Sequence, residues 1–304
     1  MTRRQATLAL VVTVSIWGLS FPALKLLFED VSPLLAVGLR FGLAALVLAP
    51  TLRGLTREDL EAGAVIGGLF AGGVALQNLG LEITTPSRSA FLVSMSALLT
   101  PPVAALVLRH RLRADLVLRL VLAIAGVFLL TAPTGSLSDV NSGDWLTMGS
   151  ALLYAGEIVA VGHYVGRISI PRVLGLKFAA TSLAGWGGMV AVETPRLEPT
   201  PAAVALLVFL LCSSLLTFTL QFRAQRVVSP SEAALIFTAE PVVAAALSFL
   251  IFGERLVAVQ LVGCAIILLA VGWPRRPGPG LRSVSPAGGA EGALPIQRRA
   301  TPGP

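Results

Sequence analysis

Cysteine and histidine are scarce in this sequence of 304 residues, which holds two of each. Cys212 and Cys264 both fall inside long apolar runs, which excludes the disulfide framework of a small secreted domain. His110 and His163 stand alone, which excludes a zinc site of the HExxH type and, with it, intramembrane metalloproteolysis. We therefore expect no metal site and no cofactor.

Charged residues are also few, at 13% of the chain, against about a quarter in soluble domains. Apolar residues make up 55%, and the mean hydropathy is +0.83. The sequence contains no phosphate-binding loop and no dinucleotide fingerprint, so direct pumping driven by a nucleotide has no support. The apolar residues gather in runs close to the roughly 20 that a helix needs to cross a bilayer. The sequence predicts a polytopic membrane protein.

The apolar runs predict helices rather than barrel strands, because none alternates apolar and polar residues with period two. The first run leads into Lys25 and Glu29 without a cleavage site, so we interpret it as a helix and not as a secretory signal. The fold class expected is all-α, with ten transmembrane helices. They span approximately 6–27, 33–51, 62–80, 86–108, 116–132, 144–165, 173–192, 202–221, 230–252 and 256–273.

Arginine is distributed unequally between the two sides of such a protein. Ten helices place both termini on one side, and Lys and Arg near helix ends are retained in the cytoplasm. With cytoplasmic termini, the inner joints hold Arg53, Arg57, Arg109, Arg111, Arg113, Arg167, Arg172, Arg223 and Arg226, and the outer joints hold Arg88, Arg196 and Arg255. We expect a multi-pass protein of the cell inner (cytoplasmic) membrane with both termini cytoplasmic.

The formal charge of +7 follows from this topology and from the carboxyl-terminal tail, so we expect no binding to nucleic acid. The tail, 274–304, contains "PRRPGPG" and scattered Gly, Ser and Arg without an apolar period. This composition predicts a disordered basic tail on the cytoplasmic side.

The two halves of the chain share a pattern. Segment 85–112 aligns without a gap with segment 229–256, so that Pro86 matches Pro230 and Arg111 matches Arg255. Because each half has five predicted helices, the matched joints face opposite sides of the membrane. This is an inverted repeat, an architecture of secondary transporters with a site near the midplane. The sequence predicts a first repeat over 1–136 and a second over 137–273, followed by the tail.

Several motifs, in order, bring a family into view: "SIWGLSFPALKLL", "LRFGLAALVLAP", "TPSRSAFL", "AEPVVAAALSFLIFGERL" and "LVGCAIILLAVG". Together they resemble the EamA-type family of the drug/metabolite transporter superfamily, over residues 6 to 273. The resemblance implies that each half is an EamA-type repeat, that the fold is a 5+5 inverted repeat, and that the protein moves small metabolites, commonly by efflux.

Two carboxylates lie deep inside predicted spans. A charge at bilayer depth costs roughly 2.5–3.5 kcal/mol on insertion scales, so it tends to face a cavity or a partner. Glu240, just before Pro241, and Glu157 lie at similar depths at 1.5 Å per residue. Glu240 fits a proton relay or the recognition of an ammonium group. The alternative is a structural pair with Arg40 or with a backbone donor.

Other polar and aromatic side chains accompany these carboxylates. Tyr154 shares a helix face with Glu157, although tyrosine also anchors helices at the interface. Arg40 suits a substrate carboxylate, which it can bind bidentately, or a clamp between helices. Trp17 can stack on a planar or cationic solute or fill the core.

Weaker candidates complete the expected cavity. Gln221 belongs to a stripe that also holds Ser214 and Thr217, and Gln77 lies in the third span. Pro22 and Pro241 remove backbone hydrogen bonds and are the expected hinges. Lys25, His163 and Lys177 are expected to lie near helix ends and to extend toward the membrane surface.

The sequence as a whole predicts a secondary-active transporter of small metabolites that exports amino acids or related compounds by alternating access. The expected partners are a small-molecule substrate, the lipid bilayer and protons. The alternatives are an efflux carrier for many drugs or cationic compounds, and a uniporter or channel without ion coupling. An enzyme is not expected, because a serine dyad would need a deep His or Lys. The substrate or coupling residues expected are Trp17, Arg40, Gln77, Tyr154, Glu157, Gln221 and Glu240.

Overall fold

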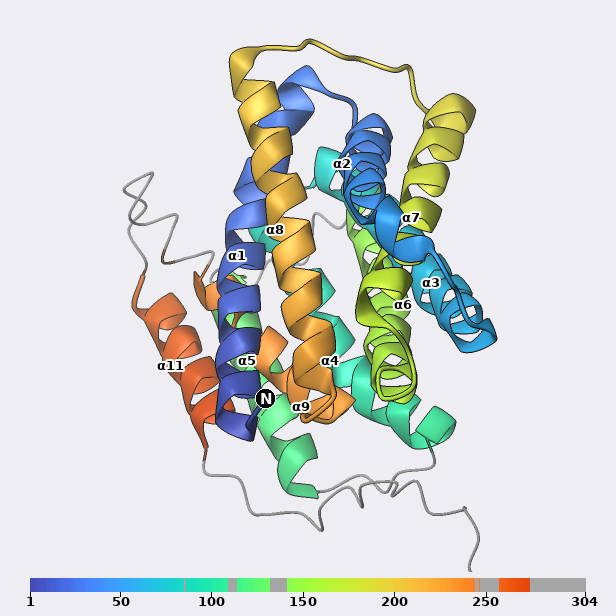
Figure 1. Cartoon of the computed structure of the whole chain (residues 1–304). Helices are drawn as coiled ribbons and strands as arrows, with labels where there is room; N and C mark the ends of the chain where they lie inside the picture. Colours follow the sequence, from blue (N-terminus) through green and yellow to red (C-terminus); the bar gives the residue numbers. More distant parts are fainter. Residues whose placement is uncertain (85, 109–113, 132–140, 244–245, 247–256, 274–304) are drawn as a thin grey trace, which may run out of the picture. The chain divides into compact units, whose positions relative to one another are not determined.

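A computed structural model describes residues 1–84, 86–108, 114–131, 141–243, 246 and 257–273. This part of the chain is helical, with a single isolated bridge between Val31 and Leu197 (Figure 1). The elements are α1 Arg3–Asp30, α2 Pro33–Leu48, η1 Ala49–Leu52, α3 Arg57–Ile83, α4 Pro86–Leu108, α5 Ala114–Thr131, α6 Ser142–Tyr164, α7 Ile170–Val192, α8 Pro201–Gln225, α9 Pro230–Phe237 and α11 Ala258–Gly272. The predictions about His110, Arg111, Arg255, the boundary at 136/137 and the tail lie outside the described residues.

Seven of the described helices are long and apolar enough to cross a bilayer: α1, α2 with η1, α3, α4, α6, α7 and α8. Large apolar side chains on them point outward, such as Leu46, Leu106 and Val190. Because a soluble protein rarely exposes so much contiguous apolar surface, these faces suit contact with lipid. The prediction of a helical, polytopic membrane protein is confirmed, and the count of ten spans stays a prediction.

Polar caps set the helix starts. Thr2, Thr56, Asn141 and Ser229 each begin a helix with a reciprocal capping box, in which the side chain three residues later bonds back to the cap. Helix α7 begins at Ile170, with Pro171 in its first turn, three residues before the predicted start. This earlier start moves every residue of α7 deeper into the helix than the sequence had indicated.

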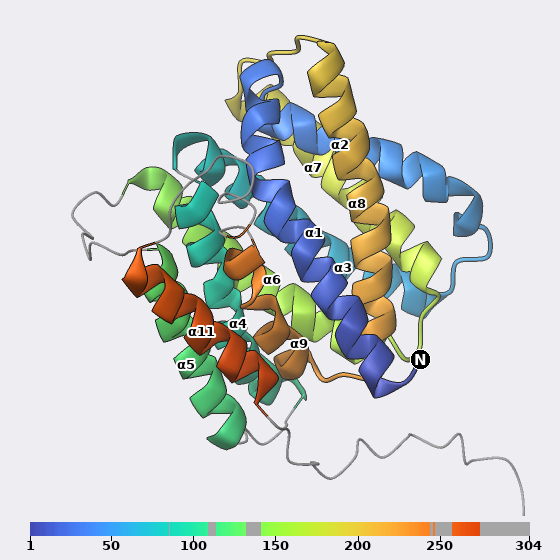
Figure 2. The ribbon, with the colours of Figure 1, turned by 90° about the vertical axis from the view of Figure 1, so that its left-hand side faces the viewer.

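Residues Met1–Gly272 form one compact unit, in which helices of the first half pack on helices of the second. Helix α1 lies along α8, α2 along α7, α3 against α6 and α7, α4 against α6, and α5 against α11 (Figures 1 and 2). Backbone bonds also tie the α1–α2 joint to the α7–α8 joint: Ser32 N donates to Arg196 O at 3.0 Å, and Glu198 N donates to Asp30 O at 2.9 Å. The two halves are therefore interlocked.

Glycine allows the closest of these contacts. A Cβ on Gly185 of α7 would lie 2.5 Å from the backbone nitrogen of Gly38 in α2, closer than atoms can approach. Gly126 of α5 and Gly263 of α11 face each other in the same way. Small residues at helix interfaces of membrane proteins let backbones approach and gain van der Waals contact.

The ninth predicted span, 230–252, is not one continuous helix in the described residues. Helix α9 ends at Phe237, and a turn at Thr238 and Ala239 precedes a new helical segment that begins at Glu240. Pro241 has no N–H to donate to the carbonyl of Phe237, four residues earlier. The hydroxyl of Thr238 also donates to the carbonyl of Leu235 at 2.7 Å. The expectation of a locally freed backbone beside Glu240 agrees with this break.

Gly185→Ala is predicted to destabilise the protein by about 1–3 kcal/mol, because the added methyl group forces α7 away from α2. Gly187→Ala, two residues along the same helix, is the matched control. Its added Cβ would meet no atom within 4 Å, and alanine favours the helix by up to about 1 kcal/mol. Thermal unfolding of the full chain in detergent measures both. Equal midpoints for the two variants would show that this close approach does not limit stability.

Candidate functional site

One cavity lies among α1, α2, α3, α4, α6, α8, the end of α9 and the residues that follow it. Its empty volume is about 850 Å³, open end included. Aromatic rings form much of its wall, among them Phe41, Phe70 and Phe218. The structure brings together all seven residues expected to bind substrate or to couple transport. They are Trp17, Arg40, Gln77, Tyr154, Glu157, Gln221 and Glu240.

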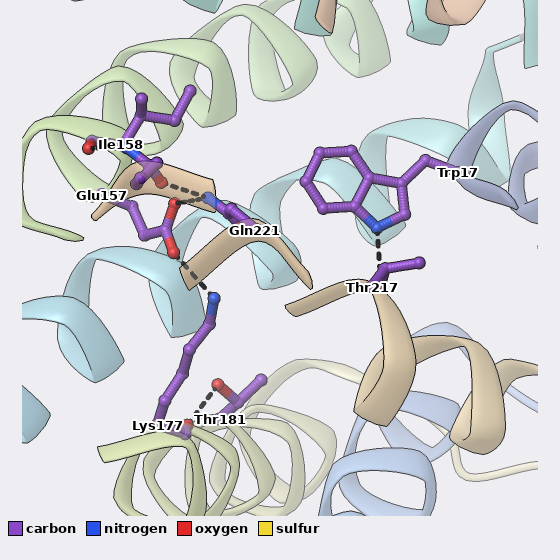
Figure 3. Close-up of polar contacts among 8 residues, drawn as sticks. Trp17, Glu157, Ile158, Lys177, Thr181, Thr217 and Gln221 are labelled. Atoms are coloured by element: carbon purple, nitrogen blue, oxygen red, sulfur yellow. Dashed lines mark hydrogen bonds and ion pairs between the residues drawn. The ribbon is translucent and has the colours of Figure 1, made fainter. Parts of the chain in front are cut away.

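Glu157 of α6 is held in a buried ion pair. Lys177 Nζ of α7 donates to Glu157 Oε1 at 2.7 Å (Figure 3), and the two side chains are 0% and 4% exposed. The ammonium also lies 3.7 Å from the ring centroids of Phe70 and Phe218. A cation over an aromatic face is stabilised by the quadrupole of the ring, and more strongly when water is excluded. Both charges are thus satisfied at bilayer depth.

The expectation that Lys177 extends to the membrane surface is wrong. With α7 predicted to begin at Val173, this lysine was placed one turn from the helix end. The helix begins at Ile170, which puts Lys177 two turns inside it and opposite Glu157. A buried ammonium requires an anionic partner, and Glu157 is that partner.

Gln221 continues the network from the other side of Glu157. Its Nε2 lies 3.3 Å from Glu157 Oε2 and 3.2 Å from Gln225 Oε1, and Gln225 Nε2 donates to the carbonyl of Ile158 at 2.8 Å (Figure 3). These bonds join α6 to α8. A buried polar network of this kind stabilises one arrangement of the helices relative to others.

Arg40 both clamps two helices and lines the cavity. Its Nε donates to the carbonyl of Leu210 at 3.1 Å and to the hydroxyl of Ser214 at 2.7 Å, which joins α2 to α8. Its Nη1 and Nη2 donate to no residue that the structure describes. The interhelical clamp expected as one alternative is present, and it uses a single donor of the guanidinium. The planar pair of donors that suits a carboxylate is left available.

Trp17, Tyr154 and Gln77 are held by bonds from neighbouring helices. Trp17 Nε1 donates to the Thr217 hydroxyl at 3.0 Å (Figure 3), and its ring lies 5.1 Å from that of Phe237, centroid to centroid. The Tyr154 hydroxyl donates to Gln77 Oε1, which joins α6 to α3. These side chains present fixed aromatic and polar surface to the cavity.

Glu240 differs from Glu157 in having no partner among the described residues. It is 7% exposed, lines the cavity and makes no hydrogen bond or ion pair with any described residue. The structural pair with Arg40, one of the sequence alternatives, is absent here, because Arg40 bonds to α8 instead. A buried carboxylate without a partner is costly, and such a group calls for a ligand, a proton or an ion to explain it.

The two expected hinges occupy different settings. Pro22 lies inside α1, which continues as one helix from Arg3 to Asp30, whereas Pro241 follows the break after α9. Near Pro22, Lys25 Nζ donates to the carbonyls of Leu81, Glu82 and Thr84 at the end of α3. Lys25 therefore caps a helix end, where a cation is favoured by the helix dipole.

Sequence reasoning missed several lining residues. Asn78 of α3 and Ser94 and Ser96 of α4 line the cavity, as does the ring of Phe70. The available signals were weak, because serine and phenylalanine are common in any membrane helix. Asn78 directly follows Gln77, which was expected at the cavity. This second amide in the same apolar span was the one signal that could have identified Asn78.

The arrangement defines a class: a multi-pass helical membrane protein with a polar, aromatic-walled cavity inside the bundle. The EamA-like transporter family model matches the chain twice, over residues 4–132 and 141–273. The chain belongs to the EamA-like transporter family, as its motifs predicted.

Individual relatives of the chain also carry the names of transporters. An uncharacterized transporter of Archaeoglobus fulgidus is 31% identical over 272 residues, which cover 88% of this chain and 85% of the relative. A probable amino-acid metabolite efflux pump of Salmonella typhimurium is 32% identical over 160 residues, which cover 51% of this chain and 52% of that protein. A solved crystal structure, 20% identical, superposes with a TM-score of 0.73 over 89% of this chain and 96% of that one, which shows a shared fold.

Ser214→Ala is predicted to cost about 1.5–3 kcal/mol of stability, because it removes the hydroxyl that accepts the charged Nε–H of Arg40. Ser213→Ala is the control, since the Ser213 hydroxyl bonds only to the Leu210 carbonyl of its own helix. Denaturant unfolding in mixed micelles compares the two variants. A loss of the same size in both would mean that the Arg40 clamp contributes nothing particular.

Proposed function

We propose that the protein is a secondary-active carrier that exports zwitterionic metabolites, amino acids or related compounds, by alternating access. The observation that carries the proposal is that two charged groups on one cavity, the Nη donors of Arg40 and the carboxylate of Glu240, pair with no described residue. A zwitterion offers the matching groups, a carboxylate and an ammonium. Tyr154 lines the same cavity.

The lining of the cavity supports the same class of solute. Sites for small molecules usually have a mostly apolar wall with a few polar groups. Asn78 Oδ1 and Gln221 Oε1 are buried and accept no hydrogen bond from the described residues. Both residues line the cavity, so a solute rich in donors, such as an ammonium, would supply what they lack. The Salmonella relative is named as a probable amino-acid metabolite efflux pump, which supports the same class of solute.

Helix packing supports the proposed 5+5 inverted repeat, with repeats over 1–136 and 137–273. The proposed repeat pairs α1 with α6, α2 with α7, α3 with α8, α4 with α9 and α5 with α11. Under this pairing the contact between α3 and α6 corresponds to the contact between α8 and α1, and both contacts occur. The contacts α2–α7 and α5–α11 map onto themselves. Ser96 and Glu240, matched by the sequence repeat, both line the cavity. Two similar halves around a central site are what alternating access requires.

In the proposed orientation the protein lies in the inner membrane and both of its termini face the cytoplasm. Arg53, Arg57, Arg167 and Arg172 then lie on the cytoplasmic side, as the retention of positive charge inside predicts. Protons are the proposed coupling ion, taken up and released by Glu240, with Pro22 and Pro241 as the points about which helices bend.

Glu240→Gln is predicted to abolish accumulation driven by a pH gradient while leaving exchange of solute across the membrane. The amide keeps the size of the side chain but cannot exchange a proton. Solute flux into proteoliposomes with and without an imposed pH gradient measures this, with the exposed Glu82→Gln as control. If the wild type only equilibrates solute and Glu240→Gln matches it at every pH, the protein is a uniporter or channel.

Arg40→Ala is predicted to reduce transport of an amino acid at least tenfold, and transport of the corresponding amine without its carboxylate much less. A bidentate bond to a carboxylate contributes about 1.5–3 kcal/mol, which is tenfold or more in affinity. The comparison of each amino acid with its decarboxylated analogue, in the same proteoliposomes, separates lost recognition from a misfolded carrier. Equal loss for all solutes, with amines preferred by the wild type, would favour the alternative of a cationic-compound efflux carrier.

A further inference from the structure

Lys177 lies behind the wall of the cavity, while its partner Glu157 forms part of the wall. The two rings that flank the ammonium, Phe70 and Phe218, line the cavity, and Lys177 is not among the described lining residues. Its Nζ lies 3.7 Å from the centroid of each ring. It donates to Glu157 Oε1 (Figure 3). The Glu157 carboxylate is therefore already paired with an ammonium of the protein, which a solute's ammonium would otherwise provide.

This pairing changes the charge that a solute meets. Four ionisable residues decide it: Arg40, Glu157, Glu240 and Lys177. The positive charge of Lys177 neutralises the negative charge of Glu157. The guanidinium of Arg40 and the carboxylate of Glu240 are then left to bind the solute. Without Lys177, two carboxylates would face the cavity, and a second positive group on the solute would be attracted rather than repelled.

We propose that Lys177 is a specificity-determining residue, a built-in counter-ion that reserves Glu157 and limits the solute to a single ammonium. The inference rests on the proposed carriage of zwitterions and deepens it. Solutes with one ammonium and one carboxylate are accepted, and solutes that carry a second ammonium are rejected. Rejection arises because a second cation would have to displace Lys177 from a buried pair, or lie unpaired beside it, and either is costly.

Norleucine and lysine are the probes, because they differ only in the terminal ammonium of the side chain. In wild-type proteoliposomes, a hundredfold excess of lysine should leave the flux of norleucine unchanged. In Lys177→Met, whose side chain has similar length and no charge, the preference for lysine over norleucine should rise at least tenfold. The side-chain ammonium of the solute then takes the place of Nζ at Glu157.

Two further variants serve as controls. Lys177→Met/Glu157→Gln removes both members of the pair and should return the preference to the wild-type value. Lys25→Met removes the other lysine of the chain, which bonds carbonyls and no carboxylate, and should leave the preference unchanged. A preference that rises equally in Lys25→Met would assign the effect to lost packing and overturn the proposal.

Outcomes for this inference and for the proposed function can be told apart. If the wild type moves neither probe and no other zwitterion, the proposed function fails. If it moves norleucine and lysine competes equally well, the function stands and the role of Lys177 is refuted, even when no variant folds. An unchanged preference in folded Lys177→Met also refutes that role and leaves the pair with a structural one.

Discussion

The need to pair charge away from water governs this structure. A lone ammonium or a lone carboxylate at bilayer depth carries a high cost in free energy. Lys177 and Glu157 pair with each other, and the faces of two rings and the amide of Gln221 add to this pairing. Through these contacts α3, α6, α7 and α8 hold one relative position. That position fixes Tyr154 and Glu157, one turn apart, on the wall of the cavity.

Close packing supplies the second constraint. Lipid offers helices no hydrophobic reason to associate, so contact between them depends on backbones that approach closely and on polar side chains that cross between them. Gly38 against Gly185 provides the first, and Arg40 bonded to Leu210 and Ser214 provides the second. Both join the first half of the chain to the second, so each half is held by the other.

Much of this was readable in the sequence. Helix spans follow from the length of the apolar runs, and the seven residues expected at the cavity do line it, because a polar group inside an apolar helix has few other places to go. Lys177 was misread because an error of three residues at the start of α7 moved it from the interior to the edge. The pairing with Glu157 depends on the packing of both α6 and α7 against α3, which no local pattern encodes. What the cavity residues bind stays a prediction.

The break after Phe237 gives the cavity an electrical polarity. Eight residues make α9 about 12 Å long, far short of the roughly 30 Å of hydrocarbon, so its carboxyl end lies within the protein rather than at the membrane surface. Glu240 begins the helical segment after the break, and its carboxylate lines the cavity there. The guanidinium of Arg40 contributes the opposite sign on the same cavity. A bound solute with separated charges would be turned into one orientation before any part of the protein moved.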